Sequence, residues 1–460
     1  MKEKFRRLFN FGLFPMIFSL AWPTMVEQAM QTAVQYIDTV MVGSLGTDAT
    51  AAVGSTTTVN WLVSSTVSAL GIGFLAYISQ SIGAGENEKA ARASAQAVFT
   101  VILSGVFFTA VTLSLSGVIP RLMQVDESVR ETASRYFFIL YSPMLFRAAS
   151  IIFGTVLRAA GETKTPMRVG ILVNAVNVVL NFLLIYPTRQ MKLASFVFTM
   201  PGAGMGVTGA AAASAVSFVV GGVCITAALF RHPLLSPKKH TILPDGDILV
   251  PCLKVAVPNM LQRFCTSLGY VFFASMINSL GKVPTAAHTV ANTVESAFYI
   301  PGYGMQSAAA TLTGNAIGSG DIKRRIETSR MIELIEAVMM IVSGALLFIF
   351  APVLMTLFSK DAQVISLGST VLRMVALSEP FYGISIVTEG MLQGAGKTVY
   401  PFVFNVIAMW GVRIAGTFIC TQLLGLGLVS AWGCMIGNNM LLLILFRIYY
   451  RKTLARKTPL

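Results

Sequence analysis

The sequence predicts an all-α integral membrane protein with twelve transmembrane helices in two related six-helix halves. Of its 460 residues, 55% are hydrophobic and only 12% are charged, a balance outside the range of ordinary soluble domains. Roughly twelve apolar stretches have the length of about 20 residues that crosses a bilayer as a helix. These runs are continuous rather than alternating, which favours helices over the strands of a membrane barrel.

The distribution of basic residues predicts the orientation of these spans. The spans are expected to begin near residues 14, 51, 94, 133, 168, 205, 250, 284, 331, 366, 401 and 427. Lys and Arg concentrate in the termini and the even-numbered connections, for example at Arg6, Lys89, Lys239 and Arg324. By the positive-inside rule both termini are expected to be cytoplasmic. The net charge of +14 therefore indicates orientation rather than nucleic-acid binding.

An internal repeat divides the chain. Pro23 corresponds to Pro258, an offset of 235 residues, and the same offset holds at two further motifs. The matching segments are Ile82–Glu86 with Ile317–Asp321, and Leu157–Pro166 with Leu392–Pro401. Six spans per half is an even number, so the halves are expected to be parallel repeats. The predicted lobes are residues 1–235 and 236–460, with a polar linker at about 231–249.

Polar residues form a stripe on the first predicted span. The stripe consists of Glu27, Gln31, Gln35 and Asp38 at helical spacing. An acid at the centre of a span costs about 2.5 to 3.5 kcal/mol, so it should face a cavity or a partner helix. Asp38 is the strongest site candidate, while Glu27, Gln31 and Gln35 are candidates for contact with a substrate. The repeat position of Asp38 is Phe273, so the second half lacks this acid.

The fifth predicted span carries a second polar stripe. Asn174, Asn177 and Asn181 occur at i, i+3 and i+7, on one face of a helix. Their carboxamides could hydrogen-bond a protonated carboxyl or coordinate a desolvated Na⁺. Because the repeat positions in the second half are not amides, the sequence predicts one ion site, in the first lobe.

The second half offers weaker candidates. Gln262 aligns with Glu27 and is a further candidate for the cavity, while Glu295, Glu379 and Glu389 are acids within predicted spans. Pro301, Gly302 and Gly304 lie inside the eighth span, where a kink or broken helix is expected to act as a hinge.

Several apparent motifs fail on their context. The run GAGKT at 394–398 lacks the glycine that a phosphate-binding loop needs at position 391, where Met391 stands. Three scattered His and five Cys without CxxC spacing predict neither a metal site nor disulfides. We therefore expect no enzyme, no cofactor and no metal beyond Na⁺ as an alternative to H⁺ at Asp38.

Taken together, these segments resemble the multidrug and toxic compound extrusion (MATE) family. The resemblance rests on the region of Asp38, IGAGE at 82–86, LRAAGETKTP at 157–166, NAVNVVLNFLLIY at 174–186, GVTGAAAAS at 206–214 and the long run around 286–321. It implies two six-helix lobes around a central V-shaped cavity, and exchange of organic cations for H⁺ or Na⁺. It also implies a prokaryotic plasma membrane, a lipid bilayer and an amphipathic small molecule as partners, no nucleic acid, and a monomer.

Particular positions match the family's ion site. Asp38 matches the coupling acid of the first helix, Asn177 and Asn181 match polar positions of the fifth, and Ala210 and Ser214 match positions of the sixth. Asn181 stands where many members carry a second Asp. Together with non-acidic residues at Gln262 and Tyr382, this favours the DinF-like over the NorM-like branch.

The expected function is secondary active export of organic cations or other amphipathic toxic compounds in exchange for H⁺, with Na⁺ as an alternative. A flippase for a lipid-linked saccharide is the other reading, and it would need cationic side chains in the cavity to hold a pyrophosphate. Only Arg147, Arg263 and Arg413 could serve. A passive channel also remains open on composition alone.

Overall fold

Twelve helical segments of bilayer-crossing length follow one another in this computed structural model, which describes residues 10–123, 125–193 and 196–455. The first six are α2 (Phe14–Gly43), α3 (Thr47–Gly83), α4 (Asn87–Leu115), the pair α6 (Glu127–Tyr141) and α7 (Met144–Ala159), α8 (Lys164–Leu184) and α9 (Gly206–Arg231). The second six are α10 (Gly246–Asn278), α11 (Lys282–Gly318), α12 (Ile322–Phe358), the pair α13 (Ala362–Ala376) and α14 (Glu379–Gly394), a segment from α15 (Val399–Val406) through α16 (Ala415–Phe418), and α17 (Leu428–Lys452). Short elements are η1 (Phe11–Leu13), α5 (Ile119–Leu122), β1 (Pro187–Leu193), β2 (Phe196–Ala203) and η2 (Pro237–Lys239).

Most of these segments are also apolar enough to cross a membrane. Within the described residues, seven pass on length and hydropathy, and nine pass if each of the pairs α6–α7 and α13–α14 forms one span. The pairs bend by 50° and 55°. The other three, α2, α10 and α11, are 30, 33 and 37 residues long, and their polar residues lower their hydropathy.

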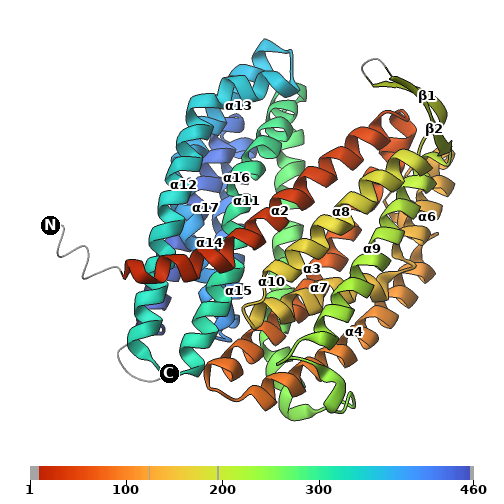
Figure 1. Ribbon diagram of the computed structural model, residues 1–460. Coiled ribbons are helices and arrows are strands. Elements are labelled where there is room, and N and C mark those ends of the chain that lie inside the picture. The colour runs from red at the N-terminus through yellow and green to blue at the C-terminus, as the bar shows by residue number, and fades with distance from the viewer. Residues whose placement is uncertain (1–9, 124, 194–195, 456–460) are drawn as a thin grey trace.

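The two halves form lobes that diverge as a V (Figure 1). Positions related by the offset of 235 residues also share their backbone conformation. At the turn after the first helix of each half, Gly46 and Gly281 have φ angles of 116° and 104°. Only glycine adopts such angles readily, so the turn requires it at both positions. We call α3 to α9, with the part of α2 that packs along α8, the N-lobe, and α11 to α17, with the part of α10 that packs along α15, the C-lobe.

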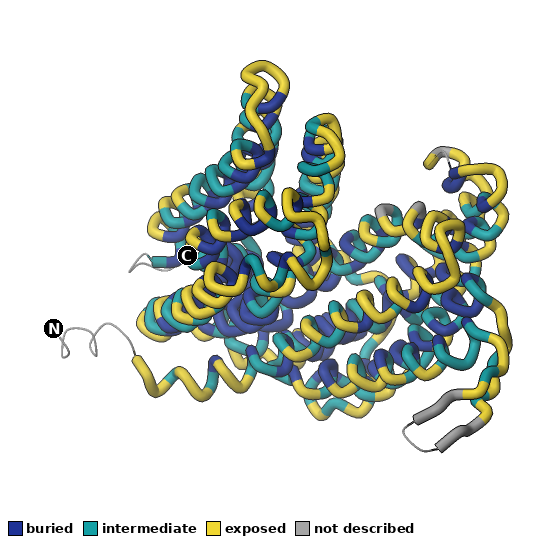
Figure 2. The backbone as a smooth tube through the Cα atoms, turned by 90° about the horizontal axis from the view of Figure 1, so that it is seen from above, coloured by how far each residue is buried: buried dark blue, intermediate teal, exposed yellow. Residues whose placement is uncertain are grey.

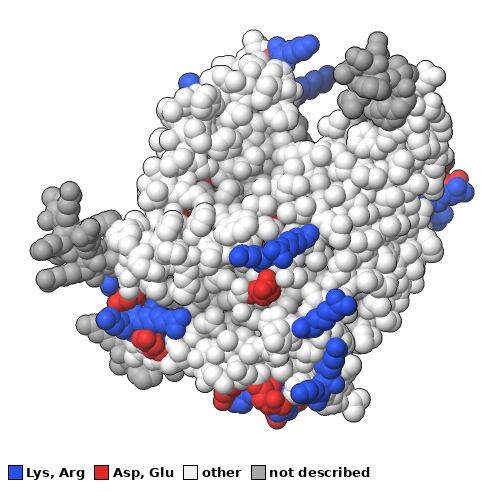
Figure 3. All heavy atoms as spheres, viewed as in Figure 1, with Lys and Arg blue, Asp and Glu red and all other residues white. Residues whose placement is uncertain are grey.

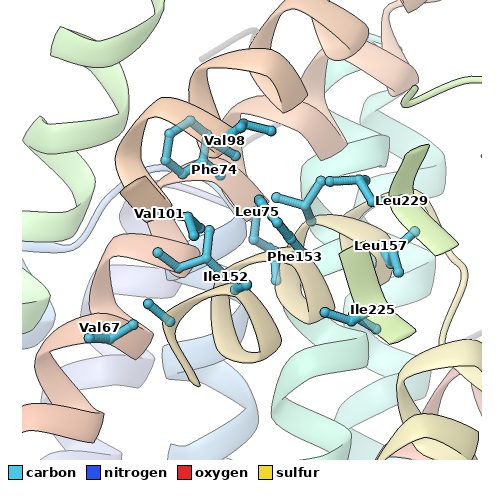
Figure 4. Close-up of a cluster of buried hydrophobic side chains, with 14 of the residues drawn as sticks. Val67, Phe74, Leu75, Val98, Val101, Ile152, Phe153, Leu157, Ile225 and Leu229 are labelled. Atoms are coloured by element: carbon cyan, nitrogen blue, oxygen red, sulfur yellow. The ribbon is translucent and has the colours of Figure 1, made fainter. Parts of the chain in front are cut away.

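The first helix of each half begins against the opposite lobe. Ile17 of α2 belongs to the same buried cluster as Met305 of α11. Cys252 of α10 joins the N-lobe core, which is built around residues such as Phe74 and Ile152 (Figure 4). The lobes therefore interlock through α2 and α10, and packing crosses the boundary placed between residues 235 and 236.

The lobes meet at the end where α17 terminates, which we call the closed end. There Gln80 Nε2 donates a hydrogen bond to Gly394 O at 2.8 Å, and Thr311 Oγ1 donates to Arg158 O at 3.1 Å. Gly318 packs so tightly on the backbone of Gln80 that a Cβ there would overlap it. Small residues permit this approach of backbones. The lobes are joined at this end and separate toward the other, the open end (Figure 1).

The outer surface suits a lipid environment. Large apolar side chains such as Leu103, Phe107, Ile349 and Leu357 are exposed. Exposed residues lie on the outward sides of the helices while buried ones lie within the lobes (Figure 2). On the face in Figure 3, charged side chains gather mainly toward the closed end, and the upper part is largely uncharged. This is the distribution that a bilayer imposes.

Three local features differ from the sequence expectations. The connection after α8 forms an antiparallel hairpin of β1 and β2. The eleventh span is π-helical over Ile407–Ile414 and Ile419–Leu423. The helix is not broken at Pro301, because α11 continues from Lys282 to Gly318, and the alternative of a kink there stays a prediction.

Candidate functional site

Asp38 lies on the part of α2 that packs along α8 in the N-lobe (Figure 1). Its side chain is partly buried, and Asn181 Nδ2 donates a hydrogen bond to Asp38 Oδ1 at 2.5 Å. Among the described residues no Lys, Arg or His lies within ion-pair distance of it. The acid therefore has an amide donor but no fixed counter-charge.

The asparagines of α8 form one connected chain with Asp38. Asn174, Asn177 and Asn181 are 7%, 5% and 1% exposed, because the i, i+3, i+7 spacing turns all three inward. Asn181 Nδ2 also donates to Asn177 Oδ1 at 3.0 Å. Asn177 Nδ2 donates to Ser214 Oγ on α9 at 3.2 Å. The chain thus joins α2, α8 and α9.

Ala210 lies one helical turn before Ser214 on α9. Its side chain is buried against an apolar cluster that contains Met41 and Ile185. Nearby, Gly209 packs on the backbone of Leu184, which lets α9 approach α8 closely. The structure therefore brings Asp38 and the four other residues predicted for the ion site into one region.

The chemistry of this region suits a small cation. The Asp38 carboxylate, two Asn carbonyls and the Ser214 hydroxyl supply oxygen atoms, which H⁺ and hard cations such as Na⁺ prefer. The buried Asn181 Oδ1 has no hydrogen-bond partner, so it can accept a proton or ligate a cation. No group of three or more His, Cys, Asp or Glu that could hold a metal occurs in the described part of the chain.

Glu27 lies outside this region, and that it contacts a substrate stays a prediction. Arg158 Nη1 lies 3.0 Å from Glu27 Oε2, and both side chains are mostly buried. The pair ties α2 to α7 and satisfies the carboxylate. Gln31 and Gln35 are exposed on α2 and remain candidates for contact with a substrate.

Gln262 is also engaged within its own lobe. Its Nε2 donates to Glu389 Oε1 at 2.9 Å, and Gln393 Nε2 donates to the same oxygen at 3.1 Å. Glu389 is thus a half-buried carboxylate that accepts hydrogen bonds from two amides. That Gln262 contacts the substrate stays a prediction.

The glycines near Pro301 serve close packing. Gly302 lies against the side chains of Glu336 and Met340, and Gly304 lies against the backbone of Met25 on α2. These contacts explain the two glycines without a broken helix. That Pro301, Gly302 and Gly304 act as a hinge stays a prediction.

Arg147 of α7, which sequence analysis names only as a candidate for holding a pyrophosphate, is buried near the site. Arg147 on α7 donates to Asn60 Oδ1 at 2.7 Å and to Ser64 Oγ at 2.5 Å, and its guanidinium lies 4.7 Å from the centre of the Phe218 ring. Tyr136 lies within electrostatic range of both Arg147 and Asp38. In the sequence, Asn60 and Ser64 are two polar residues one turn apart on an apolar span, which indicates that they have a buried partner. Only the structure shows that this partner is Arg147.

Comparison with known proteins places this architecture in a family. The MatE family model matches residues 23–183 and 258–448, so each match begins at one of the repeated prolines. "Probable multidrug resistance protein NorM" of Thermotoga maritima is 29% identical over 423 residues, covering 92% of this chain and 89% of that protein. "Probable multidrug resistance protein YoeA" of Bacillus subtilis is 26% identical over 420 residues, covering 89% and 87%.

Solved structures agree on the fold. A MOP superfamily transporter from Pyrococcus furiosus superposes with a TM-score of 0.87 at 24% identity, covering 95% of each chain. A multidrug resistance MATE family transporter in an outward-facing conformation gives a TM-score of 0.84 at 24% identity, also covering 95% of each chain. These matches confirm the twelve-helix, two-lobe fold predicted from the sequence.

Proposed function

The chain belongs to the MatE family, whose members are membrane transporters and not enzymes, and we propose that it is a secondary active multidrug exporter. Its cargo is organic cations or other amphipathic toxic compounds, and the counter-ion is H⁺ or Na⁺. The names of the relatives support the multidrug cargo. The branch within the family stays a prediction.

One observation supports the part of this proposal that concerns coupling to an ion. Asp38 hydrogen-bonds to Asn181 and has no ion-pair partner among the described residues, in a region rich in oxygen atoms. A carboxylate without a counter-charge at membrane depth is costly, so it favours a bound proton or small cation. That cation neutralises the charge that would attract a cationic substrate.

Export follows from competition at this acid. With both termini in the cytoplasm, the closed end faces inward and the open end faces outward. An ion that binds Asp38 from outside releases the substrate into the open cleft. Because the coupling between ion and substrate is reciprocal, the downhill ion drives the uphill export. Since α2 spans both lobes, a change at Asp38 also alters the contacts of α2 with α11.

The geometry gives less support to a flippase for a lipid-linked saccharide. Arg147 donates to Asn60 and Ser64, Arg413 lies over the rings of Tyr270 and Phe273, and Arg263 Nε donates to Asn259 at 3.0 Å. The three cations are on α7, the eleventh span and α10, and each is engaged locally. They do not converge as a pyrophosphate site requires.

The test is efflux of a fluorescent cation from proteoliposomes with a pH gradient and a Na⁺ gradient imposed separately. We expect one of the two gradients to drive transport by the wild-type protein, and Asp38→Asn to abolish it without loss of folded protein. Glu27→Gln, which alters an acid on the same helix outside the ion site, is the matched control and should still transport. Gradient-driven transport by Asp38→Asn at the wild-type rate would refute the assignment.

A further inference from the structure

Two of the five cysteines come together in the C-lobe. Cys420 lies in the π-helical stretch Ile419–Leu423 of the eleventh span, and Cys434 lies on α17. The Cys434 thiol donates to Cys420 Sγ at 4.0 Å, so the two sulfur atoms are in direct contact. Both side chains are half-buried, and both thiols are free. The two residues are 14 positions apart, and only the fold shows that they meet.

The eleventh span and α17 lie close enough here to be bridged. Gly416 precedes Cys420 by one helical turn, and a Cβ on Gly416 would lie 3.0 Å from Cys434 Sγ and 3.6 Å from Cys434 Cβ. Bridged cysteines have their Cβ atoms about 3.5 to 4.5 Å apart. A disulfide places the two sulfur atoms about 2 Å apart, so each thiol would have to move by about 1 Å. Because glycine stands at 416, the Cys434 side chain has room for that movement.

The π-helical backbone determines which way Cys420 faces. The eleventh span is π-helical in two stretches, whereas α8, its counterpart in the N-lobe, is a regular α-helix. A π-helical turn holds about one residue more than an α-helical turn, so it rotates the residues that follow toward a different neighbour. Such insertions are frequent at functional sites. At the offset of 235 residues Cys420 corresponds to Ile185, so the thiol pair belongs to the C-lobe alone.

The end of the eleventh span is fixed beside α17. Cys420 O accepts a hydrogen bond from Leu426 N at 2.8 Å, in the turn that leads into α17. Gln422 Nε2 donates to Ser279 Oγ of α10 at 2.8 Å. Since α17 terminates at the closed end, this turn lies at the opposite, open end. These contacts hold Cys420 next to Cys434 without a covalent bond.

The approach to the pair is apolar. Phe418, Ile419 and Leu423, neighbours of Cys420 along the chain, are exposed. A charged reagent loses hydration on such a surface, whereas an uncharged one loses little. Thiol–disulfide exchange is also faster when the departing thiol is acidic, as aromatic thiols are. The site therefore suits small, uncharged aromatic disulfides.

We propose that Cys420 and Cys434 are a redox-sensitive dithiol, which a small uncharged disulfide oxidises to a disulfide between the eleventh span and α17. One cysteine sulfur first attacks the reagent, whose S–S bond breaks, and a mixed disulfide forms. The other cysteine then displaces the remaining half of the reagent, and the Sγ–Sγ bond forms. The two cysteine protons leave with the two released thiols, so one disulfide is reduced for each one formed. This modification site is separate from Asp38 and does not depend on the proposed export function.

The test is reaction of the purified full-length protein with 4,4′-dithiodipyridine, which releases one thiopyridone at each exchange step. A variant with Cys224→Ser, Cys252→Ser and Cys265→Ser keeps only the proposed pair. We expect it to release two thiopyridones, retain no adduct and lose the mass of two hydrogen atoms. Addition of Cys434→Ser should leave one released thiopyridone and one retained adduct. The matched control keeps Cys420 with the half-buried Cys224 of α9 instead, and should retain two adducts.

Peptide mapping of the oxidised wild-type protein keeps the test independent of how these variants fold. We expect the peptides of Cys420 and Cys434 to be linked, and dithiothreitol to separate them. Separate adducts on Cys420 and Cys434 in the wild type would overturn the inference. Oxidised glutathione, which is charged, should react at least about tenfold more slowly than 4,4′-dithiodipyridine. Equal rates for the two reagents would overturn the proposed class of reagent.

Discussion

The N-lobe and the C-lobe share a backbone plan but differ in how their polar groups are satisfied. In the N-lobe, Asp38, the asparagines of α8 and Ser214 form a continuous hydrogen-bonded chain. In the C-lobe, Glu295 stands beside tyrosine rings without a hydrogen-bond or ion-pair partner among the described residues. An amide-lined acid suits a small, dehydrated cation.

This difference teaches that duplication of the fold does not duplicate the chemistry. The repeat preserves prolines, turn glycines and close helix contacts, which both lobes need in order to pack. It changes the buried polar residues, which packing does not require. The ion site that we propose therefore belongs to the N-lobe alone.

The largest effect in this comparison is expected from the amide that holds Asp38. Asn181→Leu removes the donor to Asp38 Oδ1, so coupled efflux should fall about tenfold or more. Asn174→Leu is the matched control on the same face of α8, and it should cost less because the Asn174 amide nitrogen already lacks a partner. Efflux rates from proteoliposomes measure both. Equal losses of efflux in the two variants would contradict a specific role for the hydrogen bond between Asn181 and Asp38.

A middle-sized effect is expected on stability at the N-lobe cationic centre. Asn60→Leu removes one of the two acceptors of the Arg147 guanidinium in the lobe interior, and should lower the free energy of unfolding by about 1 to 3 kcal/mol. Arg147→Met removes the charge with its donors and should cost less. Thermal melting in detergent compares the two. If Arg147→Met proved the more damaging, the centre would have a role beyond packing.

The smallest effect is expected at the ion pair between Glu27 and Arg158. Glu27→Gln weakens the link from α2 to α7 and should cost about 1 kcal/mol. The apparent affinity for an exported cation should stay within about twofold of the wild type. A titration of transport rate against cation concentration checks this. A large rise in KM would show that Glu27 contributes to substrate binding.

Much of the fold could be predicted because the bilayer constrains it. Length and hydropathy of the apolar runs indicate the spans, and the offset from Pro23 to Pro258 indicates two parallel halves. The bends between α6 and α7 and between α13 and α14 could not be located, since they depend on packing against neighbouring helices. The interlocking of α2 and α10 with the opposite lobe likewise depends on contacts far apart in sequence.

Those site residues that share one helix face could be predicted from the sequence. The spacing of Asn174, Asn177 and Asn181 gave the amide stripe, and Asp38 stood out as an acid in an apolar run. The pairing of Glu27 with Arg158 was not predictable, because the two residues are far apart in sequence and any nearby base could have served. The ring centres of Tyr299 on α11 and Tyr382 on α14 lie 5.7 Å apart, and no single segment of the sequence shows that these residues meet.

The central claim is that a small cation and the substrate oppose each other through Asp38. The most direct measurement is the affinity of purified protein for tetraphenylphosphonium across a series of pH values and Na⁺ concentrations. We predict that acid or Na⁺ weakens binding to the wild type, and that the affinity of Asp38→Asn responds to neither. Competition that persists unchanged in Asp38→Asn would contradict the account.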